Sequence, residues 1–155
     1  VMIPANVAFI SIMESFNTKV NKAAAMFLNR RGYDILDEPW KRDGGMLPID
    51  IVAKDGDSVV FVRARGRNAE FGEGFDDAGL DRDKAEAFAV NWFRDNIDEF
   101  ADAQFRFDAI SMIVMGADAN KALIRHHINA LSESCASDLP KTSEPSEEAR
   151  AAQAA

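Results

Sequence analysis

The sequence has little of what marks secreted or membrane proteins. Its 155 residues include one cysteine, Cys135, so no disulfide can form within the chain. No run approaches the roughly 18 apolar residues that a membrane-spanning helix needs. The start of the sequence shows neither the basic segment nor the small-residue cleavage site of a secretory signal. We therefore expect a cytoplasmic protein with no membrane partner.

Positive charge and histidine are also scarce. The chain has 18 lysines and arginines against 26 acidic residues, a formal net charge of -8. Indiscriminate binding of duplex DNA normally draws on a broadly basic surface, so any contact with DNA or another nucleic acid must be local. The two histidines, His126 and His127, are neighbours. Neighbouring residues on a helix point about 100° apart and rarely share a metal ion.

The length and the 47% hydrophobic content predict one domain with a proper core. This domain is expected to span residues 1–131, with residues 1–15 as a helical extension at its start. Ser, Glu, Pro and Ala dominate from residue 132 onward, so residues 132–155 are expected to form a disordered or loosely helical tail. No internal repeat is present, and the oligomeric state stays open.

The most informative stretch is residues 48–67. Two apolar runs, residues 49–53 and 59–62, flank Lys54-Asp55-Gly56-Asp57. A short gap with Gly and Asp between β-branched runs predicts a hairpin of two antiparallel strands. Because both runs are continuously apolar rather than alternating, we expect both faces of these strands to be covered.

Charged residues are concentrated on this hairpin. Side chains alternate along a strand, so Arg63, Arg65 and Arg67 should lie on one face, within reach of Asp50 on the neighbouring strand. A buried carboxylate is costly unless it is paired and hydrogen-bonded. We therefore expect Asp50 to be ionised and paired with Arg63 or Arg65.

Hydrophobic periodicity predicts the remaining elements. They are a long helix at residues 6–31, an edge strand at 33–36, a helix at 81–100 with Asp81 as N-cap, a strand at 105–115 and a short helix at 118–131. The connection at residues 68–79 is acidic and rich in glycine, which is typical of a loop. Arg106 and Asp108 are spaced so that they can pair on one face of their strand.

These residues carry a resemblance to a known family. The run Ile-Asp-Ile-Val-Ala, a hairpin, and then Phe-Val-Arg-Ala-Arg-Gly-Arg resembles the core of the YraN-like family, which is grouped with the restriction-endonuclease-like, PD-(D/E)xK superfamily. Lys84, Arg106-Phe107-Asp108 and the segment 126–131 match further positions. The resemblance implies an α/β fold with a restriction-endonuclease-like core, a central mixed β-sheet flanked by helices in the order αβββαβα.

In that family, carboxylates on the two hairpin strands bind a divalent metal and a lysine assists an activated water. This chain departs from the pattern at most of those positions. Leu47-Pro48 replaces the family's Gly-Glu, Arg63 replaces the second-strand Glu, and Arg65 replaces the lysine. Asn21 stands where the family has a further acid. Of the acidic set only Asp50 remains, so it is the one metal ligand that the resemblance implies if the site is active.

Three functions follow from this pattern. The one we favour is a catalytically degenerate endonuclease-like protein without a cofactor. It would bind nucleic acid or another phosphate-bearing ligand through Arg63, Arg65, Arg67 and Lys84. The second is an active Mg²⁺-dependent DNA endonuclease in which Glu70 or Glu73 reaches toward Asp50. The third is a structural or interaction domain whose vestigial site, Asp50 with Arg63 and Arg65, is an internal salt-bridge cluster.

Overall fold

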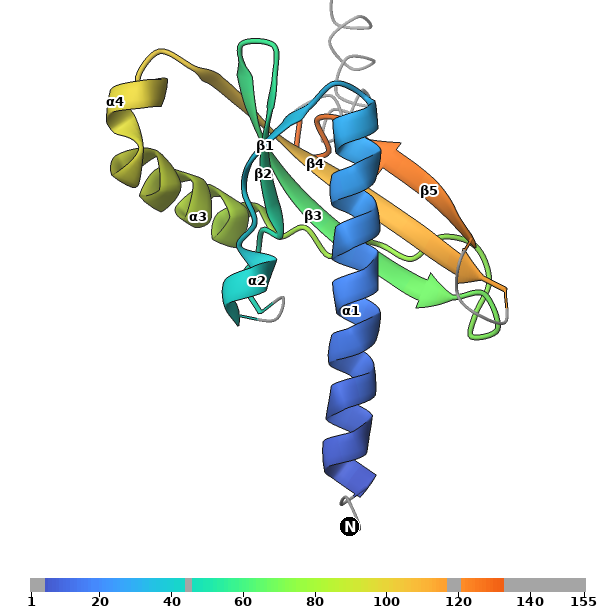
Figure 1. Ribbon diagram of the computed structural model, residues 1–155. Coiled ribbons are helices and arrows are strands. Elements are labelled where there is room, and N and C mark those ends of the chain that lie inside the picture. Colours follow the sequence, from blue (N-terminus) through green and yellow to red (C-terminus); the bar gives the residue numbers. More distant parts are fainter. Residues whose placement is uncertain (1–4, 44–45, 117–120, 133–155) are drawn as a thin grey trace, which may run out of the picture.

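The structure is a computed structural model that describes residues 5–43, 46–116 and 121–132 (Figure 1). Helices and strands follow one another as α1 (Ala5–Arg30), β1 (Asp34–Asp37), α2 (Trp40–Asp43), β2 (Ile51–Asp55), β3 (Ser58–Asn68), α3 (Arg82–Asp95), α4 (Ile97–Phe100), β4 (Gln104–Met115) and β5 (Lys121–His127). The predicted hairpin is therefore present as β2 and β3, and Gly56 supplies the positive φ of 59° in its turn.

The strands form one mixed sheet in the order β1-β2-β3-β4-β5. β3 pairs in parallel with β4, while the other neighbouring strands pair in antiparallel fashion. A parallel pair needs a crossover connection, and α3 and α4 lie on the one that joins β3 to β4. This arrangement confirms the predicted α/β class and places the hairpin strand β3 at the centre.

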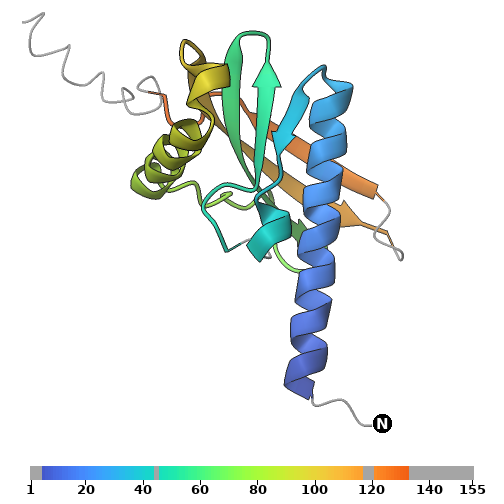
Figure 2. The ribbon, with the colours of Figure 1, turned by 60° about the vertical axis from the view of Figure 1, so that its left-hand side comes forward.

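Helices cover both faces of the hairpin, as its continuous apolarity predicted. On one face, Val60, Val62 and Ala64 of β3 pack with Val20, Ala24 and Leu28 of α1. On the other face, Val59 and Phe61 pack with Ala85, Ala89 and Trp92 of α3. Figure 2 shows α1 and α3 on opposite sides of the sheet. Side chains 63, 65 and 67 share the α3 face by strand alternation.

Gly66 allows α1 to approach β3 closely. A Cβ atom at Gly66 would lie 2.7 Å from Cγ2 of Val20. Valine in a helix strongly prefers one rotamer, so this methyl group cannot easily turn away. We expect Gly66→Ala to lower the free energy of unfolding by about 1 to 3 kcal/mol, measured by urea unfolding.

The double variant Gly66→Ala with Val20→Ala provides the control for this contact. If the clash is the cause, the double variant should be more stable than the sum of the two single losses predicts. Strict additivity of the two losses would show that crowding against α1 does not decide the choice of glycine.

The prediction of a short helix at residues 118–131 is wrong. Residues 121–127 form strand β5, which pairs with residues 109–115 of β4. The apolar spacing in this segment also fits a helix, but a helix here would leave the outer edge of β4 with unpaired backbone groups. Pairing with that edge therefore overrides the local pattern. Within the predicted segment, residues 117–120 lie outside the described part of the chain.

The helix predicted at residues 81–100 is also divided. Asp81 caps α3 as expected, because its Oδ1 accepts a hydrogen bond from the Lys84 N–H at 3.0 Å. The helix then breaks at Asn96, whose φ of -126° is not helical, and α4 follows. The Asn96 side chain donates to the Trp92 carbonyl at 2.8 Å, a local bond that competes with helix continuation.

The predicted tail lies outside the described residues from residue 133 onward, and Cys135 lies there with it. Of the predicted extension at residues 1–15, residues 5–15 form the first turns of α1, which project beyond the sheet in Figure 1, and residues 1–4 lie outside the described part of the chain. No helix in the described part of the chain is long and apolar enough to cross a membrane.

Candidate functional site

Asp50 lies at the entrance to β2 and is completely buried. Its backbone is fixed on both sides, because its N–H donates to the Val62 carbonyl and its carbonyl accepts from the Trp40 N–H. Its Oδ2 accepts from the Ala64 N–H at 2.9 Å and from Arg65 Nη1 at 3.2 Å. The predicted ion pair is therefore present, with Arg65 as the partner.

The other two hairpin arginines hold the acidic loop at residues 68–79. Arg63 donates from Nη1 to the Leu47 carbonyl and from Nε to the Ala78 carbonyl, the latter at 3.4 Å. Arg67 donates from Nε to the Gly74 carbonyl at 2.9 Å and lies 3.7 Å from the Asp76 carboxylate. Through the carbonyls of Ala78 and Gly74, Arg63 and Arg67 bring the loop onto β3.

The residues around Asp50 do not fit a divalent metal. Mg²⁺ prefers several oxygen ligands in octahedral geometry, whereas the flanking hairpin positions are Pro48, Arg63 and Arg65. Glu70 and Glu73 are exposed on the loop, and the described part of the chain holds no group of three His, Cys, Asp or Glu side chains arranged for a metal.

Asn21 and Lys84 complete the positions that the resemblance singled out. Asn21 is buried in α1, and its Nδ2 donates to the Asn17 carbonyl one turn earlier at 3.0 Å. The neutral amide at this position makes a hydrogen bond within α1 and supplies no carboxylate for a metal. Lys84 is exposed in the first turn of α3. Its role in binding phosphate stays a prediction, as do those of Arg63, Arg65 and Arg67.

A second polar cluster lies on the α1 face of the sheet, and the sequence predicted only its Arg106–Asp108 pair. Asp108 is fully buried and accepts from Arg106 Nε at 3.0 Å and from the Asn129 N–H at 2.8 Å. Its Oδ2 lies 2.8 Å from His126 Nε2. Arg106 also donates to the Tyr33 hydroxyl at 2.7 Å. The predicted pairing of Arg106 with Asp108 is confirmed, and the cluster joins β4, β5 and the residue before β1.

The electrostatics of this cluster favour an ionised carboxylate. Burial alone would raise the pKa of Asp108, but hydrogen bonds from His126, Arg106 and the Asn129 N–H outweigh it and hold the pKa below its usual value. His126 was missed because its segment was predicted as a helix. On a strand His126 and His127 point to opposite faces, which brings only His126 to Asp108.

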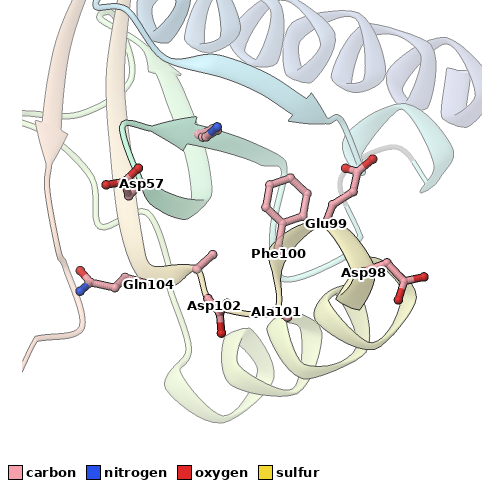
Figure 3. Close-up of a pocket in the computed structure, with 9 residues that line it drawn as sticks. Asp57, Asp98, Glu99, Phe100, Ala101, Asp102 and Gln104 are labelled. Atoms are coloured by element: carbon pink, nitrogen blue, oxygen red, sulfur yellow. The ribbon is translucent and has the colours of Figure 1, made fainter.

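A hollow of about 530 Å³ lies where the hairpin turn meets α4 (Figure 3). Asp57, Asp98, Glu99 and Asp102 are among the residues that line it. Figure 3 shows these carboxylates spread around the hollow rather than directed at one point. This surface is therefore an acidic, solvated end of the molecule, away from Asp50 and the arginines.

Comparisons with known proteins agree with the hairpin motif. The family model described as "Uncharacterised protein family UPF0102" matches residues 20–112, from the second half of α1 to most of β4. A UPF0102 protein of Desulfosudis oleivorans is 30% identical over 118 residues, which cover 76% of this chain and 92% of that protein. One of Geobacter sulfurreducens is 32% identical over 110 residues, covering 69% and 80%.

A further UPF0102 protein, from Renibacterium salmoninarum, is 35% identical over 95 residues, which cover 59% of this chain and 75% of that protein. The family match spans the hairpin, the loop, α3 and the Arg106-Phe107-Asp108 run, and these carry most of the YraN-like resemblance; the segment 126–131 lies beyond the match. The chain therefore belongs to the UPF0102 family, the YraN family.

Proposed function

We propose that this protein binds nucleic acid, or another phosphate-bearing ligand, at the hairpin arginines and does not hydrolyse it. The observation that carries the proposal is the Arg65–Asp50 pair. The Arg65 guanidinium lies 3.2 Å from the Asp50 carboxylate. In the nuclease superfamily that the hairpin motif resembles, a metal ion would lie beside this carboxylate. Positive charge is thus retained at the site in a form that requires no cofactor.

The exposure of the pair supports binding from solution. Asp50 is completely buried, whereas 31% of the Arg65 side chain is exposed to solvent. A guanidinium is always charged and matches the geometry of phosphate oxygens. Arg63 and Arg65 place two guanidinium groups on the strand beside the single carboxylate of Asp50, so positive charge is concentrated at the site. Lys84, exposed at the start of α3, adds to it.

The same residues argue against hydrolysis. A guanidinium stays protonated at all ordinary pH values, so Arg65 cannot accept a proton from an attacking water. Metal-dependent hydrolysis of phosphodiesters needs oxygen ligands that hold the ion against both the water and the phosphate. Around Asp50 those positions carry Pro48 and Arg63. Mg²⁺-dependent cleavage of DNA would support the alternative of an active nuclease.

Arg65→Ala is expected to weaken the binding of a fluorescein-labelled single-stranded DNA by about tenfold, because it removes one charge-assisted contact to phosphate. The measurement is fluorescence anisotropy in EDTA at several salt concentrations. The slope of log K against log salt should become shallower by about 0.7. Arg30→Ala, which removes an exposed arginine at the end of α1, is the matched control and should leave the affinity unchanged.

Equal losses in the two variants would mean that binding is general electrostatics rather than a site. No salt-dependent binding by the wild-type protein would favour the third function, a structural or interaction domain. One observation favours that alternative: Arg63 and Arg67 already donate to backbone carbonyls of the loop at residues 68–79.

A further inference from the structure

A cavity of about 550 Å³ lies beside the hairpin arginines, on the α3 face of β4 and β5. On this face α3 packs against Phe107, but the next inward positions of β4 are the small residues Ala109 and Ser111. β5 contributes Arg125 and His127. The small floor and the absence of α3 above it leave a hollow, which residues 75–80 and 128–131 enclose from two sides. We name it the β4–β5 cavity.

The β4–β5 cavity lies next to the arginine site on the same face of the sheet. In the sheet register, Arg63 is level with Ala109, which is level with His127. Arg65 is likewise level with Ser111, which is level with Arg125. The two sites also share a wall, because Arg63 donates to the carbonyl of Ala78, a residue that lines the cavity.

The walls of the cavity combine an apolar lining with charges at the rim. Leu80, Ile128 and Leu131 supply apolar surface. The Arg125 guanidinium lies 4.9 Å from the centre of the Phe75 ring, which fixes a planar cation at the edge. The exposed groups Asp77 and His127 can accept and donate hydrogen bonds there. This chemistry suits a flat, largely apolar group with polar edges that is attached to a negative charge.

From this juxtaposition we infer that the β4–β5 cavity receives an unpaired base of a nucleic-acid strand whose phosphate lies at Arg65. The inference rests on the proposed function and narrows its ligand to single-stranded or locally unpaired nucleic acid. The volume is in the range of small-molecule sites, and a nucleobase can pack on the apolar walls while its edge meets Asp77 and His127. A paired base is stacked and hydrogen-bonded within its duplex and cannot enter.

The overall charge supports the same preference. A net charge of -8 gives the protein little general attraction for duplex DNA. Binding must then gain from contacts other than counterion release, and burial of a base in an apolar cavity is such a contact. Arg125 at the rim, level with Arg65 across the sheet, is placed to meet the next phosphate of the same strand.

The test compares three labelled DNA ligands of equal length by anisotropy in EDTA: a single strand, the same strand with abasic positions, and a duplex. The inference predicts that the wild-type protein binds the base-containing strand roughly tenfold more tightly than the other two. Arg125→Gln, and Ala109→Leu, which fills the floor, should reduce this advantage to about twofold or less. Lys121→Gln, at the other end of β5, removes the same charge as Arg125→Gln and should keep the advantage.

The outcomes separate the proposed binding of phosphate at the hairpin arginines from the inferred binding of a base in the β4–β5 cavity. If all three ligands bind equally and Arg65→Ala weakens each of them, the proposed function stands and the inference about the base is overturned. If no ligand binds the wild-type protein at low salt, the proposed function fails and the inference fails with it. Arg125 is exposed on an edge strand, so Arg125→Gln should not disturb folding. Its result therefore tests the inference even if Ala109→Leu lowers the melting temperature.

Discussion

Replacing Asp108 by alanine is expected to lower the free energy of unfolding by about 4 kcal/mol, the loss typical of breaking a buried ion pair. Asp108 is fully buried, and its carboxylate is in contact with Arg106, His126 and the Asn129 N–H. Without it, the Asn129 N–H loses its carboxylate acceptor, and Arg106 loses one of its two carboxylate partners and keeps Asp55. Urea unfolding measures the loss. A loss below about 1 kcal/mol would show that the cluster is not a structural clamp.

The pH dependence gives an independent readout of the same group. The pKa of Asp108 is lower in the folded state than in an unfolded chain. A carboxyl group with a depressed pKa adds stability above its unfolded pKa of about 3.9, and that stability is lost as the pH falls through the lower folded pKa. Melting curves of Asp108→Asn between about pH 2 and 5 should therefore fall less steeply with acid than those of the wild-type protein.

Asp50→Ala is expected to cost about 3 kcal/mol of stability, a loss in melting temperature of roughly 10 °C. The carboxylate is completely buried and satisfies both the Ala64 N–H and Arg65. Removing it leaves a donor in the interior with no acceptor. Asp50→Asn is the matched variant, because it keeps an oxygen for the Ala64 N–H and removes only the charge. Its loss should be smaller.

The effect of phosphate on the melting temperature distinguishes an Asp50–Arg65 pair that only stabilises the fold from one that lies in a binding site. Asp50 competes with any anion for Arg65, so phosphate should raise the melting temperature of Asp50→Ala by more than that of the wild-type protein. Equal effects of phosphate on the two proteins, together with an unchanged melting temperature in Asp50→Ala, would contradict the pairing described above.

The hairpin and its ion pair could be predicted from sequence because their signals are local. Two apolar runs around Gly56 define the turn, and the period of two along a strand places Arg63, Arg65 and Arg67 on one face. Because Arg63 and Arg65 share this face, one of them lies within reach of Asp50 even if the strand pairing shifts by two residues. The pair with Arg65 follows from these facts, although the choice between Arg63 and Arg65 needed the structure.

The parts that could not be predicted depend on distant partners. β5 forms because β4 offers an open edge, and nothing in residues 121–127 specifies that edge. The contact of His126 with Asp108 depends on that pairing and disappears when the segment is treated as a helix. The acceptors of Arg63 and Arg67 are loop carbonyls, which any residue type can supply and which leave no pattern in the sequence.

The most direct test of the claim that Arg65 has replaced a metal is a crystal soaked in Mn²⁺ with a short single-stranded DNA. We expect Arg65 to remain in contact with Asp50, a phosphate to lie at the guanidinium, and no anomalous peak beside the carboxylate. A Mn²⁺ peak within roughly 2 to 2.5 Å of the Asp50 carboxylate, with Arg65 displaced, would contradict this claim and would favour the alternative of an active metal-dependent nuclease.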